Sequence, residues 1–89
     1  MVKVKRLVLD VLKPHQPDIL EFACAIARCG ADLHVKLAVS EMDERTESTV
    51  ISIAGEDINL VRVRAAIEDL GGSLHSIDEA EVVGSPDSE

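Results

Sequence analysis

The sequence predicts an α+β fold of the ferredoxin-like type, with the order strand, helix, strand, strand, helix, strand. Four segments alternate between apolar and polar residues, which is typical of strands. Two others repeat apolar residues at helical spacing, and each stands between strands. Two split βαβ halves therefore follow one another along the chain. We expect a two-layer sandwich, in which a four-stranded antiparallel sheet carries both helices on one face.

The first half of the chain has the pattern of a strand, a helix and a second strand. Residues 4–13 alternate between apolar and polar side chains. The inward face of this strand is expected to hold Leu7, Leu9 and Val11. Pro17 suits the first position of the following helix, because its missing N–H would have no partner there. The apolar stripe of that helix is Ile19, Phe22, Ala23 and Ile26. Gly30 ends the helix, and residues 33–42 alternate as the next strand.

The second half begins with a polar turn at residues 43–47, after which residues 48–54 form the partner strand of a hairpin. Asn59 is a suitable N-cap for the second helix. The buried stripe of this helix is Leu60, Val63, Ile67 and Leu70. Two glycines close it, and residues 73–83 form the last strand with weaker alternation.

Length and composition limit the class of protein. Eighty-nine residues make a single domain, which we place at residues 1–84 and follow with a flexible acidic tail at residues 85–89. Nine basic and seventeen acidic residues give a net charge of −8, and Phe22 is the one aromatic residue. Nucleic-acid binding depends on basic and stacking side chains, so this composition argues against it.

The expected location is the cytoplasm. No apolar run approaches the roughly 20 residues that a membrane span needs, which argues against a membrane partner. The basic amino terminus runs straight into an alternating segment and does not resemble a secretion signal. The two cysteines, Cys24 and Cys29, are poorly aimed at each other on a helix and lack the spacing of a redox or zinc pair.

The predicted fold leaves one face of the sheet without helices, and we call it the open face. Its apolar members are Val8, Leu12, Ala38, Val50 and Ala54. Its charged or titratable members are Arg6, Asp10, His34 and Lys36. This mixture is too apolar for a purely solvated face, and exposed apolar patches usually mark contact surfaces. We therefore expect the protein to associate with further copies of itself.

Three segments resemble a family of small archaeal proteins that is described only as a domain of unknown function. They are the stretch RLVLDVLKPH from Arg6, the hairpin around Glu41–Asp43 with Thr46 and Glu47, and the stretch GGSLHSIDE from Gly71. The resemblance extends from about Val4 to Gly84. It implies a ferredoxin-like fold and assembly into closed homo-oligomeric rings, and it implies no particular activity.

Acidic residues are the candidate metal ligands. Asp10 lies in the middle of the first strand, and Asp78 and Glu79 lie on the last strand, which neighbours the first in this fold. Carboxylates of this kind hold hard cations, so a Ca²⁺ or Mg²⁺ site is one hypothesis. The alternative is that Asp10 pairs with a basic side chain or with a neighbouring subunit. A second candidate site lies in the hairpin, where Asp43 and Glu47 would hold a cation between subunits unless they are simply solvated.

The histidines suggest a different kind of site. His15 lies beside the start of the first helix, where it would form an anion pocket together with the helix N–H groups, with Asp10 as a further ligand-binding candidate. The alternative is a loop histidine that is hydrogen-bonded to the backbone. His75 and Asp78 should point to opposite faces unless a bulge intervenes.

Three functions remain open on the sequence alone. The first, which we favour, is a homo-oligomeric module that binds a divalent cation or small ligand at subunit interfaces. The second is a small enzyme with an inter-subunit active site, using His15 or His75 with Asp10. The third is a purely structural or protein-partner role.

Overall fold

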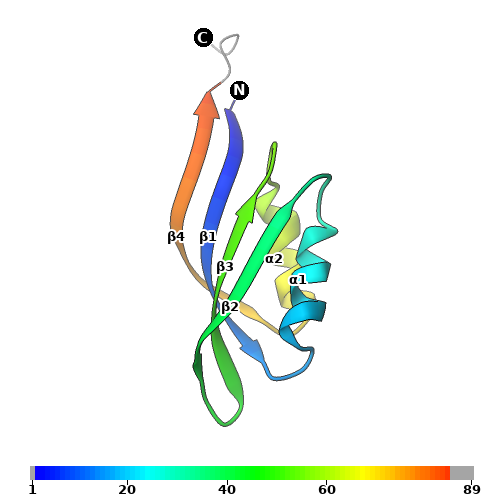
Figure 1. Ribbon diagram of the computed structural model, residues 1–89, viewed down its shortest axis with the longest axis vertical. Coiled ribbons are helices and arrows are strands. Elements are labelled where there is room, and N and C mark those ends of the chain that lie inside the picture. The colour runs from blue at the N-terminus through cyan, green and yellow to red at the C-terminus, as the bar shows by residue number, and fades with distance from the viewer. Residues whose placement is uncertain (1, 85–89) are drawn as a thin grey trace.

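The computed structural model describes residues 2–84, and its elements follow the predicted order (Figure 1). They are β1 (Val2–Pro14), α1 (Ile19–Ala27), β2 (His34–Met42), β3 (Thr46–Ala54), α2 (Leu60–Asp69) and β4 (Ser73–Gly84). The strands form one antiparallel sheet in the order β2-β3-β1-β4. Both helices lie on the same side of this sheet, which confirms the ferredoxin-like α+β sandwich (Figure 1).

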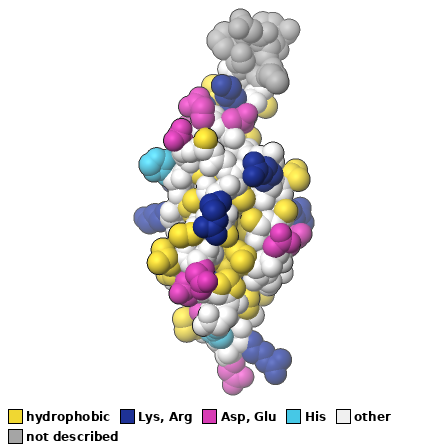
Figure 2. All heavy atoms as spheres, turned by 90° about the vertical axis from the view of Figure 1, so that its right-hand side faces the viewer, with side chains coloured by type: hydrophobic (Ala, Val, Ile, Leu, Met, Phe, Trp, Pro, Cys, Tyr) yellow, Lys and Arg dark blue, Asp and Glu magenta, His cyan; other side chains and the backbone are white. Residues whose placement is uncertain are grey.

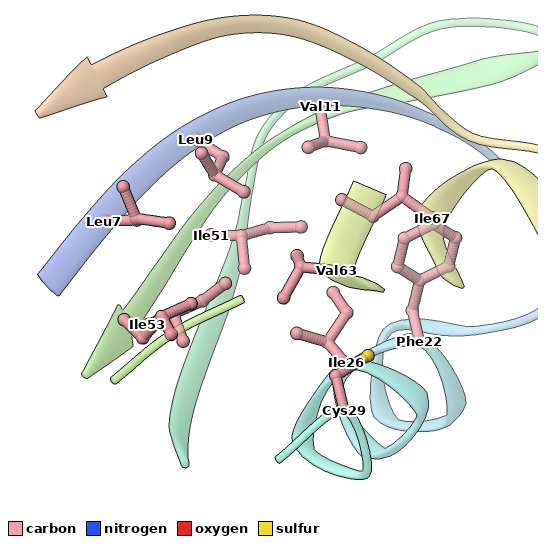
Figure 3. Close-up of a cluster of buried hydrophobic side chains, with 11 residues drawn as sticks. Leu7, Leu9, Val11, Phe22, Ile26, Cys29, Ile51, Ile53, Val63 and Ile67 are labelled. Carbon is pink, nitrogen blue, oxygen red and sulfur yellow. The ribbon is translucent and has the colours of Figure 1, made fainter. Parts of the chain in front are cut away.

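The core lies between the sheet and the two helices (Figure 3). Leu7, Leu9 and Val11 of β1 are buried as predicted, and both helices contribute from their predicted stripes. The fully buried apolar side chains are Leu9, Val11, Phe22, Ile26, Ile51, Ile53, Val63 and Ile67. Ile19 is the exception, because 41% of it remains exposed in the first turn of α1. The core therefore begins one turn further along α1 than the stripe predicts.

The helix starts are fixed by side-chain caps. Asp18 caps α1 by accepting a hydrogen bond from the Glu21 N–H at 2.9 Å. Pro17 therefore precedes the cap, and its predicted place at the first helical position is wrong by two residues. Asn59 caps α2, as predicted, and accepts from the Arg62 N–H at 3.1 Å. Both caps are the short polar side chains that satisfy otherwise unpaired N–H groups.

The glycine pair after α2 reverses the chain into β4. Gly71 has a φ of 86°, which lies in the left-handed region that favours glycine. Gly72 is buried, and a Cβ atom at this position would lie 2.8 Å from the Cζ atom of Phe22. The pair therefore lets β4 start directly against the core.

The sheet extends past the helical layer, and the molecule measures 50 × 22 × 17 Å (Figure 1). Pairing between β1 and β3 starts at Arg6, so the earlier residues of β1 pair with β4 alone. We call residues 2–4 and 82–84 the β1–β4 arm. Neither helix in the described chain is long and apolar enough to cross a membrane. The tail predicted at residues 85–89 lies outside the described residues.

Candidate functional site

A cluster of three charged side chains lies at the end of β1. Lys13 is completely buried, and its ammonium donates to Glu47 Oε1 at 3.0 Å and to the carbonyl of Pro14 at 2.8 Å. It also lies 5.7 Å from the centre of the Phe22 ring, close enough for a cation–π contact. Lys13 and Glu47 face each other directly in the β1–β3 register. A buried lysine is stable only when it is paired in this way.

His15 joins this cluster from the loop after β1. Its Nδ1 lies 2.9 Å from Glu47 Oε2, and its Nε2 lies 3.0 Å from the backbone carbonyls of both Asp43 and Glu44. All three partners are acceptors, so both ring nitrogens must carry hydrogen to satisfy them. The hydrogen bond to Glu47 is the main reason why the pKa of His15 is raised, with a further contribution from the Glu44 carbonyl. The imidazolium thus fastens the β2–β3 loop to the end of β1.

These contacts bear on the predicted sites at His15, Asp43 and Glu47. The hydrogen bond from His15 and then the one from Lys13 lower the pKa of Glu47, and its two oxygens each already accept one of these bonds. Glu47 belongs to β3, so the turn predicted at residues 43–47 is shorter than expected. The Asp43 carboxylate accepts from the Glu44 N–H at 2.6 Å. The structure thus has His15 hydrogen-bonded to the backbone, as the alternative interpretation expected.

Asp10 and His75 meet on the open face. Both line a hollow of about 260 Å³, together with Leu12 and Ser48. Asp10 faces Ser76 in the β1–β4 register, whereas Val11 faces Leu74. His75 is therefore the extra residue of a β-bulge. It follows Leu74, which packs against the core, so its side chain points to the open face. The sequence contains no local signal for this bulge.

Asp78 and Glu79 have other partners. Asp78 accepts a hydrogen bond from the Ser76 hydroxyl at 2.7 Å, and Glu79 lies 3.3 Å from Nε of Arg6. Asp78 is itself an extra residue, because Glu79 faces Val8 while Ile77 faces Leu9. Across residues 2–84, no group of three or more His, Cys, Asp or Glu side chains is arranged to hold a metal ion. A cation site at Asp10 stays a prediction that needs ligands from outside one chain.

The fold and its open face place the protein among the ferredoxin-like α+β sandwiches. Residues 5–86 match the model of the family DUF211, described as "Uncharacterized ArCR". Over 76 residues the chain is 38% identical to the uncharacterized protein MJ0319 of the archaeon Methanocaldococcus jannaschii. This match covers 85% of the present chain and 78% of the relative. The protein therefore belongs to the DUF211 family, whose function is not characterised.

Proposed function

We propose that this protein is a homo-oligomeric module of the cytoplasm, in which copies associate through the β1–β4 arm and bind a small ligand on the open face. The observation that carries this proposal is the exposure of apolar side chains on the arm. Val2, Val82 and Val83 are 64%, 50% and 46% exposed. The two cysteines are unpaired, which fits a reducing compartment.

The arm has too little cover to be stable in water by itself. A ribbon of two strands is marginal without a third strand or a helix against it. Val2 and Val82 share one side of the arm by register, and Val83 lies on the other side. Covering the exposed half of these three side chains would contribute about 3 kcal/mol per copy. That is a large share of the roughly 5–15 kcal/mol that stabilises a small domain.

The edge strand β4 supports the same partner. Twelve residues long, it leaves a row of backbone N–H and C=O groups without a neighbouring strand. Two bulges and three acidic residues protect its middle against pairing. The end of the strand, Val82–Gly84, carries no such protection. Because the exposed end is both apolar and unpaired, a second copy with the same end is the partner that we propose.

Sedimentation velocity of the purified protein tests this proposal. We expect the wild type to sediment as an oligomer at micromolar concentration and the variant Val82→Lys/Val83→Lys to shift toward the 9.6 kDa chain. Two buried lysines in a contact would be costly, whereas on an exposed strand they are tolerated.

A matched control is available on the helices. Leu20 and Val61 are 70% and 79% exposed. The side of the molecule that carries the two helices shows hydrophobic side chains interspersed with charged ones (Figure 2). Leu20→Lys/Val61→Lys adds the same charge and should leave the oligomer intact. A folded wild type that sediments as a single chain at all concentrations would rule the proposal out.

The ligand on the open face is tested separately, with a divalent cation as the first candidate. Asp10 offers one carboxylate on the open face, and Ca²⁺ takes six to eight oxygen ligands, so a neighbouring copy would have to supply others. Calorimetric titration with Ca²⁺ and Mg²⁺ should give heat for the wild type and much less for Asp10→Asn. Absence of heat for the assembled wild type would remove the cation and leave the assembly standing.

A second candidate function is a small enzyme with an inter-subunit active site. The placement of Asp10 and His75 on one hollow with the Ser48 hydroxyl favours it, because carboxylate and imidazole groups exchange protons during hydrolysis. His15 lacks this relation to Asp10, since its ring is bound to Glu47 and to the β2–β3 loop. A hydrolase screen should then find activity that His75→Ala removes and His15→Ala leaves. Activity that is indifferent to His75→Ala would exclude this site.

A further inference from the structure

The open face carries a second hollow, at the end opposite the charged cluster. Its volume is about 310 Å³, and its lining consists of Arg6, His34, Val35, Lys36, Ser52 and Ala54. Among residues 2–84, no acidic side chain lines it. Such a concentration of basic side chains is unexpected in a chain whose net charge is −8.

The strand order explains the shape of this hollow. Two cross-strand rows meet in it, because Ala54 pairs with both His34 and Arg6, while Ser52 pairs with Lys36. The long side chains therefore stand on β2 and β1, and the short ones stand on β3 between them. The small residues of β3 form the floor of the hollow, and the longer side chains of β1 and β2 form its walls. The walls are the basic residues.

These basic side chains have few ion-pair partners of their own. Within residues 2–84, neither His34 nor Lys36 takes part in an ion pair. Arg6 contacts Glu79 through Nε alone, at 3.3 Å, and both side chains of that pair are largely exposed. The guanidinium thus keeps donors that a second acceptor can use. Glu81 also faces Arg6, across the β1–β4 pairing.

We propose that this hollow, lined by Arg6, His34, Lys36 and Ser52, binds the phosphate group of a small molecule. Arginine recognises oxyanions through its planar set of N–H donors, and lysine adds a point charge. The serine hydroxyl supplies a further donor on the floor. A volume of about 310 Å³ lies at the small end of ligand pockets, which fits a small metabolite. The site is complete within one chain and deepens the ligand part of the proposed function.

Titration of the isotope-labelled protein by NMR at low ionic strength tests this site. The probes are inorganic phosphate, glycerol phosphate and acetate. Phosphate and glycerol phosphate should shift the amide signals of residues 34–36, 52–54 and 6 in a saturable way. Tighter binding of glycerol phosphate would identify a phosphate ester as the ligand, and equal binding would identify free phosphate. Acetate should bind at least tenfold more weakly, because it carries one charge and two oxygens.

Three variants separate a specific site from general attraction to positive charge. Lys36→Gln removes a lining cation and should weaken phosphate binding about fivefold to tenfold. Ser52→Val keeps the charge but fills the floor, and should weaken binding at least as much. Arg62→Gln removes a cation from α2, in the other layer, and should leave binding unchanged.

Phosphate binding can be measured separately from the oligomeric state. The same titration is run on the wild type and on Val82→Lys/Val83→Lys, so that binding by a single chain is measured directly. Absence of saturable binding in both proteins would overturn the phosphate site without affecting the assembly. Shifts scattered over all basic residues, with Lys36→Gln and Arg62→Gln behaving alike, would also overturn it.

Discussion

The two ends of β1 each carry a lysine–glutamate pair, one buried and the other exposed. At one end, Lys13 is fully buried under α1 and pairs with Glu47, which is itself buried. At the other end, Lys5 pairs with Glu56 at 2.7 Å, but 27% of the lysine side chain and 77% of the glutamate side chain remain exposed. Both are lysine–glutamate pairs, and both lysines lie on β1. They differ in whether the helical layer covers them.

This difference separates the part of the molecule that stabilises the fold from the part whose surface is free to contact a partner. A buried pair can replace the lost hydration only with good geometry and further hydrogen bonds. The Lys13 ammonium has such bonds, and no buried side-chain polar atom of the described chain lacks a partner. At the other end, β1 extends past the helices into the β1–β4 arm, where Val2, Val82 and Val83 are exposed (Figure 1). The free surface therefore lies at this end and along the open face.

The largest effect that we expect comes from removing the buried cation. Lys13→Met keeps the shape of the side chain but leaves the Glu47 carboxylate with His15 as its single cationic partner. Breaking a buried pair from one side costs about 3 kcal/mol in the free energy of unfolding, which urea denaturation measures. Lys5→Met is the matched control and should change stability far less. Equal losses in the two variants would contradict the role that we assign to burial.

The pH dependence of stability should come from the same cluster. The pKa of His15 is raised in the fold, so its contribution is fully present below its ordinary value of 6.5 and is lost as pH rises through the higher folded value. The pKa of Glu47 is lowered, so its contribution is present above 4.5 and is lost as pH falls through the lower folded value. Stability from this cluster is therefore greatest between pH 4.5 and 6.5.

Urea denaturation over a pH series measures this dependence. In the wild type, the free energy of unfolding should decline on the alkaline side as the His15 imidazolium loses its proton. His15→Gln should remove most of that decline, whereas His75→Gln should retain it. A decline that persists unchanged in His15→Gln would show that another group causes it.

The regular parts of the fold could be predicted because local signals and packing agree there. Asn59 caps α2, and the alternation of Leu7, Leu9 and Val11 continues as the buried face of β1. The same alternation, extended by one step, also places Lys13 on the inward face. In β3, Glu47 has the same parity as the buried Thr49. The pair was therefore detectable in principle, as two opposite charges on facing inward positions.

The open-face sites were less accessible to prediction. The register shift at His75 has no glycine or proline to mark it, so the meeting of His75 with Asp10 depends on tertiary pairing. The basic hollow depends on which strands are neighbours, because Arg6 and Lys36 are thirty residues apart in the chain. Ferredoxin-like topology brings β1 and β2 to either side of β3. That arrangement, more than any short motif, creates the hollow.

The smallest expected effect separates the two lysine–glutamate pairs by their response to salt. The distance beyond which salt screens exposed charges falls from about 10 Å at 0.1 M to about 3 Å at 1 M, whereas buried pairs are screened much less. The slight difference between Lys5→Met and the wild type should therefore vanish in high salt. The deficit of Lys13→Met should persist there, because no ion enters its surroundings. Thermal unfolding of the three proteins at low and high salt measures both differences, and a Lys13→Met deficit that vanished in high salt would mean that the buried cluster is open to solvent.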